Sequence, residues 1–187
     1  MACNLTSARG LSCKDTVGGV KAIYFADFDP LLYGNLTFTS GELATTASNF
    51  TAFRYDVRPN SSGLAVEVTN EVAGSASYKA TLEVVLHTPT QADSDELIKL
   101  IQGRTIAWVW DANENLWSLG LKNGCVVEAA TMSIGTARTD LHGYTLTITA
   151  EEAEFPIRVV DSADASQADY PFDGVAGTGT ITVTNPS

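Results

Sequence analysis

Residues 144 to 149 read Tyr-Thr-Leu-Thr-Ile-Thr, and this alternation of large apolar side chains with threonine decides the fold. Successive side chains of a strand point to opposite faces, so Tyr144, Leu146 and Ile148 share one face and the threonines share the other. The same alternation recurs in three further stretches, residues 65–69, 78–86 and 178–184. Strands with one buried and one solvated face are typical of antiparallel sheets. The pattern therefore predicts a mostly β protein.

Turn residues separate these strands. The sequences Pro59-Asn60-Ser61-Ser62-Gly63 and Gly74-Ser75 interrupt the alternation, and they predict that residues 49 to 88 form a meander of long antiparallel strands. A second hairpin is predicted further along the chain, with strands at 104–110 and 116–121. In its first strand, Ile106, Trp108 and Trp110 share one face, which we expect to pack in the core.

One helix is predicted over residues 91 to 102. Thr90 is a favoured N-cap residue, Asp93 follows three positions later, and Gly103 is a residue type that often follows a helix. The spacing of Leu97, Leu100 and Ile101 predicts that these three side chains form the buried stripe, with Ile98 at its edge.

Further strands are expected at 125–134, 141–149 and 155–160. Eight to ten short strands with one inserted helix predict an antiparallel β-sandwich or small barrel with one flanking α-helix. We divide the chain into an N-terminal arm (1–18), a β-sandwich domain with the inserted helix (19–160), and an acidic loop with a C-terminal strand (161–187).

The composition limits the function classes. Of the 187 residues, 44% are hydrophobic and 18% are charged, which indicates a folded domain, and the formal net charge is −11. Nucleic-acid binding depends on Lys and Arg neutralising phosphates, so this acidity argues against a nucleic-acid-binding surface. The N-terminus lacks the basic-then-apolar layout of a signal peptide, and no run approaches the roughly 18 apolar residues that span a bilayer. We therefore expect a protein made in a cytosol that has no membrane partner.

Residues that could carry chemistry are few. The chain has two histidines, His87 and His142, and either could pair with Cys125 in a thiol enzyme, although no local signature surrounds Cys125. Asp93, Asp95 and Glu96 suit the acidic first turn of a helix better than a metal site. We expect no enzymatic activity, no cofactor and no metal. Trp108, Trp110 and Trp117 offer an alternative as a sugar-stacking platform of a carbohydrate-binding module.

The order of elements resembles that of bacteriophage tail-tube and related virion proteins. The resemblance lies in the helix TQADSDELIKLIQGR, the hairpin IAWVWDANENLWSLG, the segment NGCVVEAATMSIGTARTDLHGYTLTITAEE and the opening CKDTVGGVKAIYFADFD. It covers the chain from Cys13 to about Glu152 and consists of loose patterns rather than a catalytic fingerprint. It implies a virion location, with six copies joining their sheets into a ring and rings stacking into a tube.

In such a tube the acidity has a use, because a negative channel repels DNA phosphates and lets DNA pass without specific binding. Glu67, Glu71 and Glu83 on the predicted meander are the candidate wall residues. The partners are then other copies of the chain and other virion proteins. The alternatives are another virion component of similar fold (tail terminator, neck, baseplate or head decoration) and a non-viral carbohydrate-binding β-sandwich.

Overall fold

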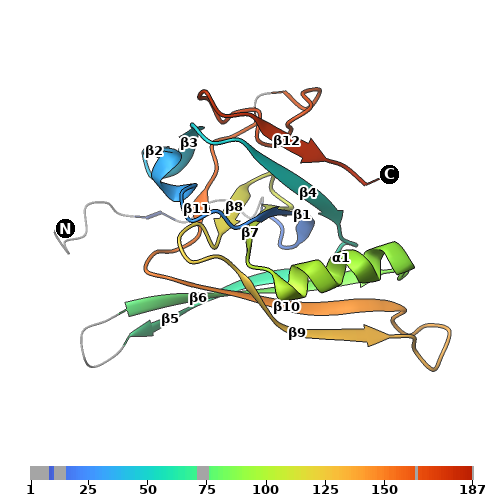
Figure 1. Ribbon diagram of the computed structural model, residues 1–187. Helices are drawn as coiled ribbons and strands as arrows, with labels where there is room; N and C mark the ends of the chain where they lie inside the picture. Colours follow the sequence, from blue (N-terminus) through green and yellow to red (C-terminus); the bar gives the residue numbers. More distant parts are fainter. Residues whose placement is uncertain (1–8, 11–15, 71–75, 163, 187) are drawn as a thin grey trace.

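The computed structural model describes residues 9–10, 16–70, 76–162 and 164–186. The fold is mostly β, with one α-helix and a short 3₁₀ turn, η1 (Tyr33–Asn35). Two sheets stack on each other, and α1 (Gln91–Gln102) closes one end of the gap between them (Figure 1). The predicted sandwich with one flanking helix is confirmed. The small-barrel alternative is wrong, because the strands form separate sheets instead of one closed sheet.

The larger sheet has six strands. Their order is β11 (Ile157–Arg158), β8 (Leu116–Leu119), β7 (Thr105–Asp111), β1 (Val20–Asp27), β4 (Phe50–Asp56) and β12 (Ile181–Thr184). β12 runs parallel to β4, which departs from the purely antiparallel pairing that we predicted. The central strands β1 and β7 are buried along almost their whole length, so this sheet has a core on each of its faces.

The smaller sheet has four strands, all antiparallel. Their order is β5 (Gly63–Asn70), β6 (Ala76–His87), β10 (Gly143–Glu152) and β9 (Val126–Ser133). A third, two-stranded ribbon consists of β2 (Leu36–Thr39) and β3 (Glu42–Thr46). In Figure 1 the four-stranded sheet is the lowest layer, and no described helix or strand lies beneath it.

The first core lies between the two sheets. Leu82 and Val84 of β6 and Leu146 and Ile148 of β10 pack there against side chains of the six-stranded sheet that include Ile23. The second core lies on the other face of the six-stranded sheet. Its members include Trp108, Leu43 of the ribbon and Phe172 of the C-terminal segment.

The predicted meander over residues 49–88 is wrong in its first part. β4 pairs with β1 in the six-stranded sheet, and only β5 and β6 form the expected hairpin. A turn after Arg58, where the Ser61 amide donates to the Arg58 carbonyl, carries the chain from one sheet to the other. Local alternation marks β4 as a strand but contains no information about which sheet it joins.

The helix has the predicted bounds and the predicted cap. Thr90 and Asp93 form a capping box, in which each side chain accepts a hydrogen bond from the other residue's backbone amide. Leu97 and Leu100 are buried as expected, but Ile101 is 40% exposed, so its placement in the buried stripe was wrong. Because the helix covers only one end of the sandwich, fewer of its apolar side chains pack in the core than predicted. In the described part of the chain no helix is long and apolar enough to cross a membrane.

Candidate functional site

The candidate functional surface is the outer face of the four-stranded sheet, meaning the side chains that point away from the first core. Alternation assigns it, because Leu82 and Val84 of β6 and Leu146 and Ile148 of β10 point inward and their neighbours must point outward. The outer face consists of Ala65, Glu67, Thr69, Lys79, Thr81, Glu83, Val85, Val126, Ala129, Thr131, Thr145, Thr147, Thr149 and Glu151. Threonine and carboxylates dominate it, and such a face favours water over a packed partner.

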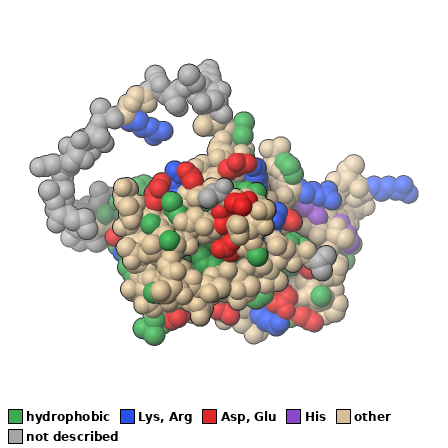
Figure 2. Space-filling view, turned by 90° about the horizontal axis from the view of Figure 1, so that it is seen from above, with side chains coloured by type: hydrophobic (Ala, Val, Ile, Leu, Met, Phe, Trp, Pro, Cys, Tyr) green, Lys and Arg blue, Asp and Glu red, His purple; other side chains and the backbone are tan. Residues whose placement is uncertain are grey.

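The charges on this face are mainly negative. Lys79 is opposite Glu67 of β5 and Glu151 of β10, and its ammonium lies 3.4 Å from the carboxylate of Glu128. Glu83 is opposite Gly63 and Thr147, and it forms no ion pair with a lysine or arginine among the described residues. Lys79 therefore stands among the three carboxylates of the outer face, and Glu128 of β9 adds a fourth beside it. The side of the molecule that carries β12 also displays a group of carboxylates (Figure 2).

The structure places two of the three predicted wall residues. Glu67 and Glu83 are exposed on the outer face, on neighbouring strands. Glu71 lies outside the described residues. The sequence analysis missed Glu151 and Lys79, although both occupy outward positions of the alternating strands and could have been found by the same counting.

Both side edges of the sheet are free. β5 pairs only with β6, and β9 pairs only with β10, so each leaves one row of backbone groups without a strand partner among the described residues. Exposed edges of this kind are prone to pair with another chain. The two edges are therefore suited to pairing with another chain, whereas the outer face between them is suited to contact with water.

No family emerges from comparison with known proteins. The chain matches no protein-family model, no curated protein and no solved structure. The functional argument therefore depends on the geometry of the chain itself.

The proposed cysteine–histidine pairs do not come together. Cys125 directly precedes Val126, which is opposite Thr149 of β10, whereas His87 is opposite Gly143 at the other end of that strand. Six residues of extended chain separate the two ends by about 20 Å. His142 is exposed and adjoins Gly143, so it lies at the same distant end.

Burial also makes Cys125 a poor nucleophile. Its side chain is 1% exposed, and burial raises the pKa of the thiol from its ordinary value of 9.0 to about 12. The reactive form of cysteine is the thiolate, which this environment disfavours at neutral pH.

The pKa of Cys125 leads to a prediction for alkaline solutions. The unfolded chain loses the thiol proton near pH 9 while the folded chain retains it, so the free energy of unfolding should fall as pH rises from about 9 towards 12. Urea unfolding at several pH values should show a steeper fall for a Cys3→Ser, Cys13→Ser chain than for the same chain with Cys125→Ala. In the native state iodoacetamide should leave Cys125 unmodified at pH 8.5 or so. Rapid native-state alkylation would contradict this description.

The acidic residues of α1 are engaged locally. Asp93 completes the capping box, Asp95 accepts a hydrogen bond from Gln91, and Glu96 pairs with Lys99. Within the described ranges no group of three or more His, Cys, Asp or Glu side chains could hold a metal ion.

The three tryptophans do not form a shared platform. Trp108 is 1% exposed and stacks on Phe50 at a ring separation of 5.1 Å, while the indole of Trp117 donates to Asp111. Trp110 is nearly buried and meets Tyr170 edge-on. A sugar ring could therefore not stack across all three.

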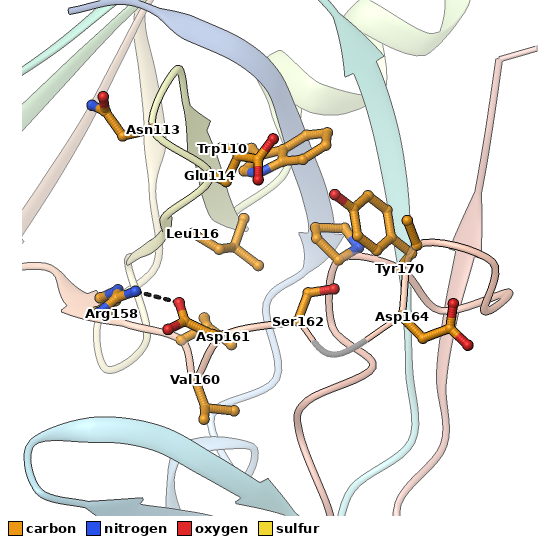
Figure 3. Close-up of a pocket in the computed structure, with 13 residues that line it drawn as sticks. Trp110, Asn113, Glu114, Leu116, Arg158, Val160, Asp161, Ser162, Asp164 and Tyr170 are labelled. Atoms are coloured by element: carbon orange, nitrogen blue, oxygen red, sulfur yellow. Dashed lines mark hydrogen bonds and ion pairs between the residues drawn. The ribbon is translucent and has the colours of Figure 1, made fainter. Parts of the chain in front are cut away.

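A cavity of about 430 Å³ borders Trp110 and Tyr170 (Figure 3). Arg158 lies on the other side of this cavity and pairs with both Asp161 and Glu42, so its charge is already compensated. Among the described residues that line this cavity, no charged side chain is left available to select a ligand.

Proposed function

We propose that this chain is a structural subunit that assembles through the edges of its four-stranded sheet into a closed ring, and that stacked rings form a DNA-conducting tail tube of a phage virion. The observation that carries the proposal is the uncovered, acidic outer face bounded by two free edge strands. The resemblance of the chain to tail-tube proteins supplies the expectation of six copies and of a virion.

The number of strands suits ring closure. In the order β5-β6-β10-β9 neighbouring strands alternate in direction, so β5 and β9 run antiparallel to each other. A copy rotated about an axis roughly along the strands therefore brings its β5 beside β9 of the first copy in antiparallel orientation. Repetition of this step gives a continuous antiparallel sheet that removes both edges.

The stagger of the two edges also suits a barrel. The positions of the two edge strands can be compared along β6. Ser133, at the end of β9, is opposite Gly143, which is opposite His87 of β6. Gly63, at the start of β5, is opposite Glu83 of β6. Full pairing of β9 with a neighbouring β5 would shift successive copies by about four residues, or roughly 13 Å along the strands. Over four strand spacings this shift corresponds to a tilt of about 35°, which is within the range of closed barrels.

The outer face would then line the channel. Six copies contribute 24 strands, and at this tilt the barrel would be about 45 Å across between strand backbones, which is wider than a DNA duplex. Glu67, Glu83 and Glu151 would face the channel, where their charge repels phosphates within roughly 10 Å of the wall.

Light scattering after size-exclusion chromatography, with negative-stain microscopy, tests the proposal on the purified full chain. We expect rings or tubes about 100 Å wide, from six domains of this size around a channel. A protein that remains monomeric at the highest attainable concentration would contradict the proposal, and specific glycan binding by that monomer would favour the carbohydrate-binding alternative.

A further inference from the structure

The helix α1 carries an apolar flank that the other described residues leave exposed. Ile98 and Ile101 are three positions apart, on one side of the helix, and are 51% and 40% exposed. The opposite flank, with Glu96 and Lys99, borders a cavity beside Phe53 of β4. The two isoleucines therefore point away from the six-stranded sheet.

This flank overhangs β9. Ser94 lies one turn before Ile98, and its hydroxyl hydrogen-bonds that of Tyr144 of β10 at 2.6 Å. Tyr144 is opposite Met132 of β9, so Met132 lies on the same side of the sheet as the helix. α1 also contacts β9, and Figure 1 shows the helix running along the side of the four-stranded sheet that faces the six-stranded sheet.

Met132 is 54% exposed, and Ile134, just beyond β9, is 73% exposed. We call the set Ile98, Ile101, Met132 and Ile134 the apolar corner. It lies at a free strand edge, where two elements of the same chain come together and nothing in the described ranges covers the gap beyond β9. Four large apolar side chains exposed along one edge of the sheet, on its core side, indicate a binding surface rather than scattered surface residues.

The other edge of the sheet carries a matching feature. Leu64, Val66 and Val68 of β5 point to the core side, opposite Leu82, Ala80 and Tyr78 of β6. Val68 is 49% exposed, and no element within the described part of the chain covers it. A helix on the core side, beyond the β5 edge, would bury this side chain.

We propose that the apolar corner binds the β5 edge of a second copy, with Ile98 and Ile101 packing on the core-side residues of that neighbour's β5. This inference rests on the proposed ring. In the ring, β5 of the next copy pairs with β9. On the core side of the joined sheet, the neighbour's β5 then places Leu64, Val66 and Val68 next to the row of side chains that contains Met132. These side chains lie below the exposed flank of α1. The helix of each copy then covers the seam to the next copy, as it already covers the end of its own sheet.

Introducing charge into the apolar corner tests whether its burial stabilises the assembly. Ile98→Glu with Ile101→Glu should leave the monomer folded, because both side chains are exposed, and should raise the protein concentration needed for assembly by roughly ten- to a hundredfold. The matched control Lys99→Glu, on the other flank of the same helix, should assemble like the unmodified chain. Circular dichroism checks folding, and sedimentation velocity measures assembly.

Crosslinking tests the position of the partner. Two proteins that both carry Cys3→Ser and Cys13→Ser are prepared, one with Ile98→Cys and the other with Val68→Cys. After co-assembly and mild oxidation, we expect a disulfide-linked dimer that contains one chain of each kind. Each protein alone should give little dimer, because its one engineered cysteine lies at the same edge of every copy and finds no cysteine across the seam, while Cys125 is buried.

The outcomes separate this inference from the ring proposal. Loss of assembly in the double Glu variant together with the mixed dimer supports it. If unmodified protein forms rings but either result is missing, the seam is covered differently and the inference is overturned while the ring stands. If the unmodified chain never assembles, both are overturned.

Discussion

Phe172→Ala is expected to lower the free energy of unfolding by about 4 kcal/mol, a large part of the stability of a domain of this size. Phe172 is fully buried, and its ring meets those of Tyr24 and Trp108 edge-on at 5.5 and 5.3 Å. Truncation would leave a cavity in the second core and remove these contacts. Urea unfolding followed by tryptophan fluorescence measures the change.

Phe155→Ala is the matched control, because Phe155 is 55% exposed and should contribute much less. The comparison tests whether the acidic C-terminal segment is part of the folded unit. A small effect of Phe172→Ala, similar to that of the control, would mean that this segment separates from the sheet without unfolding the rest.

Reversing two wall charges should convert the channel from repelling to binding DNA. Glu67→Lys with Glu83→Lys changes the charge of the outer face by four units per copy and places three lysines there with Lys79. Assembled tubes of this variant should bind a short DNA duplex at least about a hundredfold more tightly at low salt than unmodified tubes, with affinity falling steeply as salt rises. In a virion the same change should slow passage of the genome.

The matched control carries Glu96→Lys and Glu114→Lys, which alter the net charge equally on exposed positions away from the outer face. It should assemble normally and bind DNA much more weakly than the wall variant. Equal binding by both variants would show that overall charge, rather than the channel face, controls DNA affinity. Fluorescence anisotropy over a salt series measures both.

Local chemistry made several parts of the fold predictable. The alternation of Tyr144, Leu146 and Ile148 with threonines follows directly from strand geometry, and these three residues are buried. The helix begins and ends as predicted because Thr90 and Asp93 supply a complete capping box. Glu67 and Glu83 were predicted as wall residues without a face being assigned, and the structure places both on the face that points away from the core.

Long-range pairing could not be predicted in the same way. β4 and β5 are neighbours in sequence, yet β4 joins β1, because strand partners depend on how both cores close. Ile101 has the spacing of a buried residue, but the helix lies at the end of the sandwich and has no neighbour on that side. The C-terminal strand was placed at 178–184, but it is confined to Ile181–Thr184. The residues just before it bond to the end of β3 instead, where the Gly179 amide donates to the Thr46 carbonyl.

The function is the least predictable part. An assembly surface has no recognisable sequence motif, because free edges and an uncovered face are properties of the whole sheet and not of particular side chains. The resemblance to tail-tube proteins directed attention to the residues around 67 and 83, and the free edges of β5 and β9 now give a physical reason for assembly. The virion role itself stays a prediction.

A cryo-EM reconstruction of the assembled particle tests the central claim most directly. We expect a closed ring in which β5 of each copy lies beside β9 of the next, strands tilt by about 35°, and Glu67 and Glu83 face the channel. A particle in which these glutamates point outward, or in which copies meet through the six-stranded sheet, would contradict it.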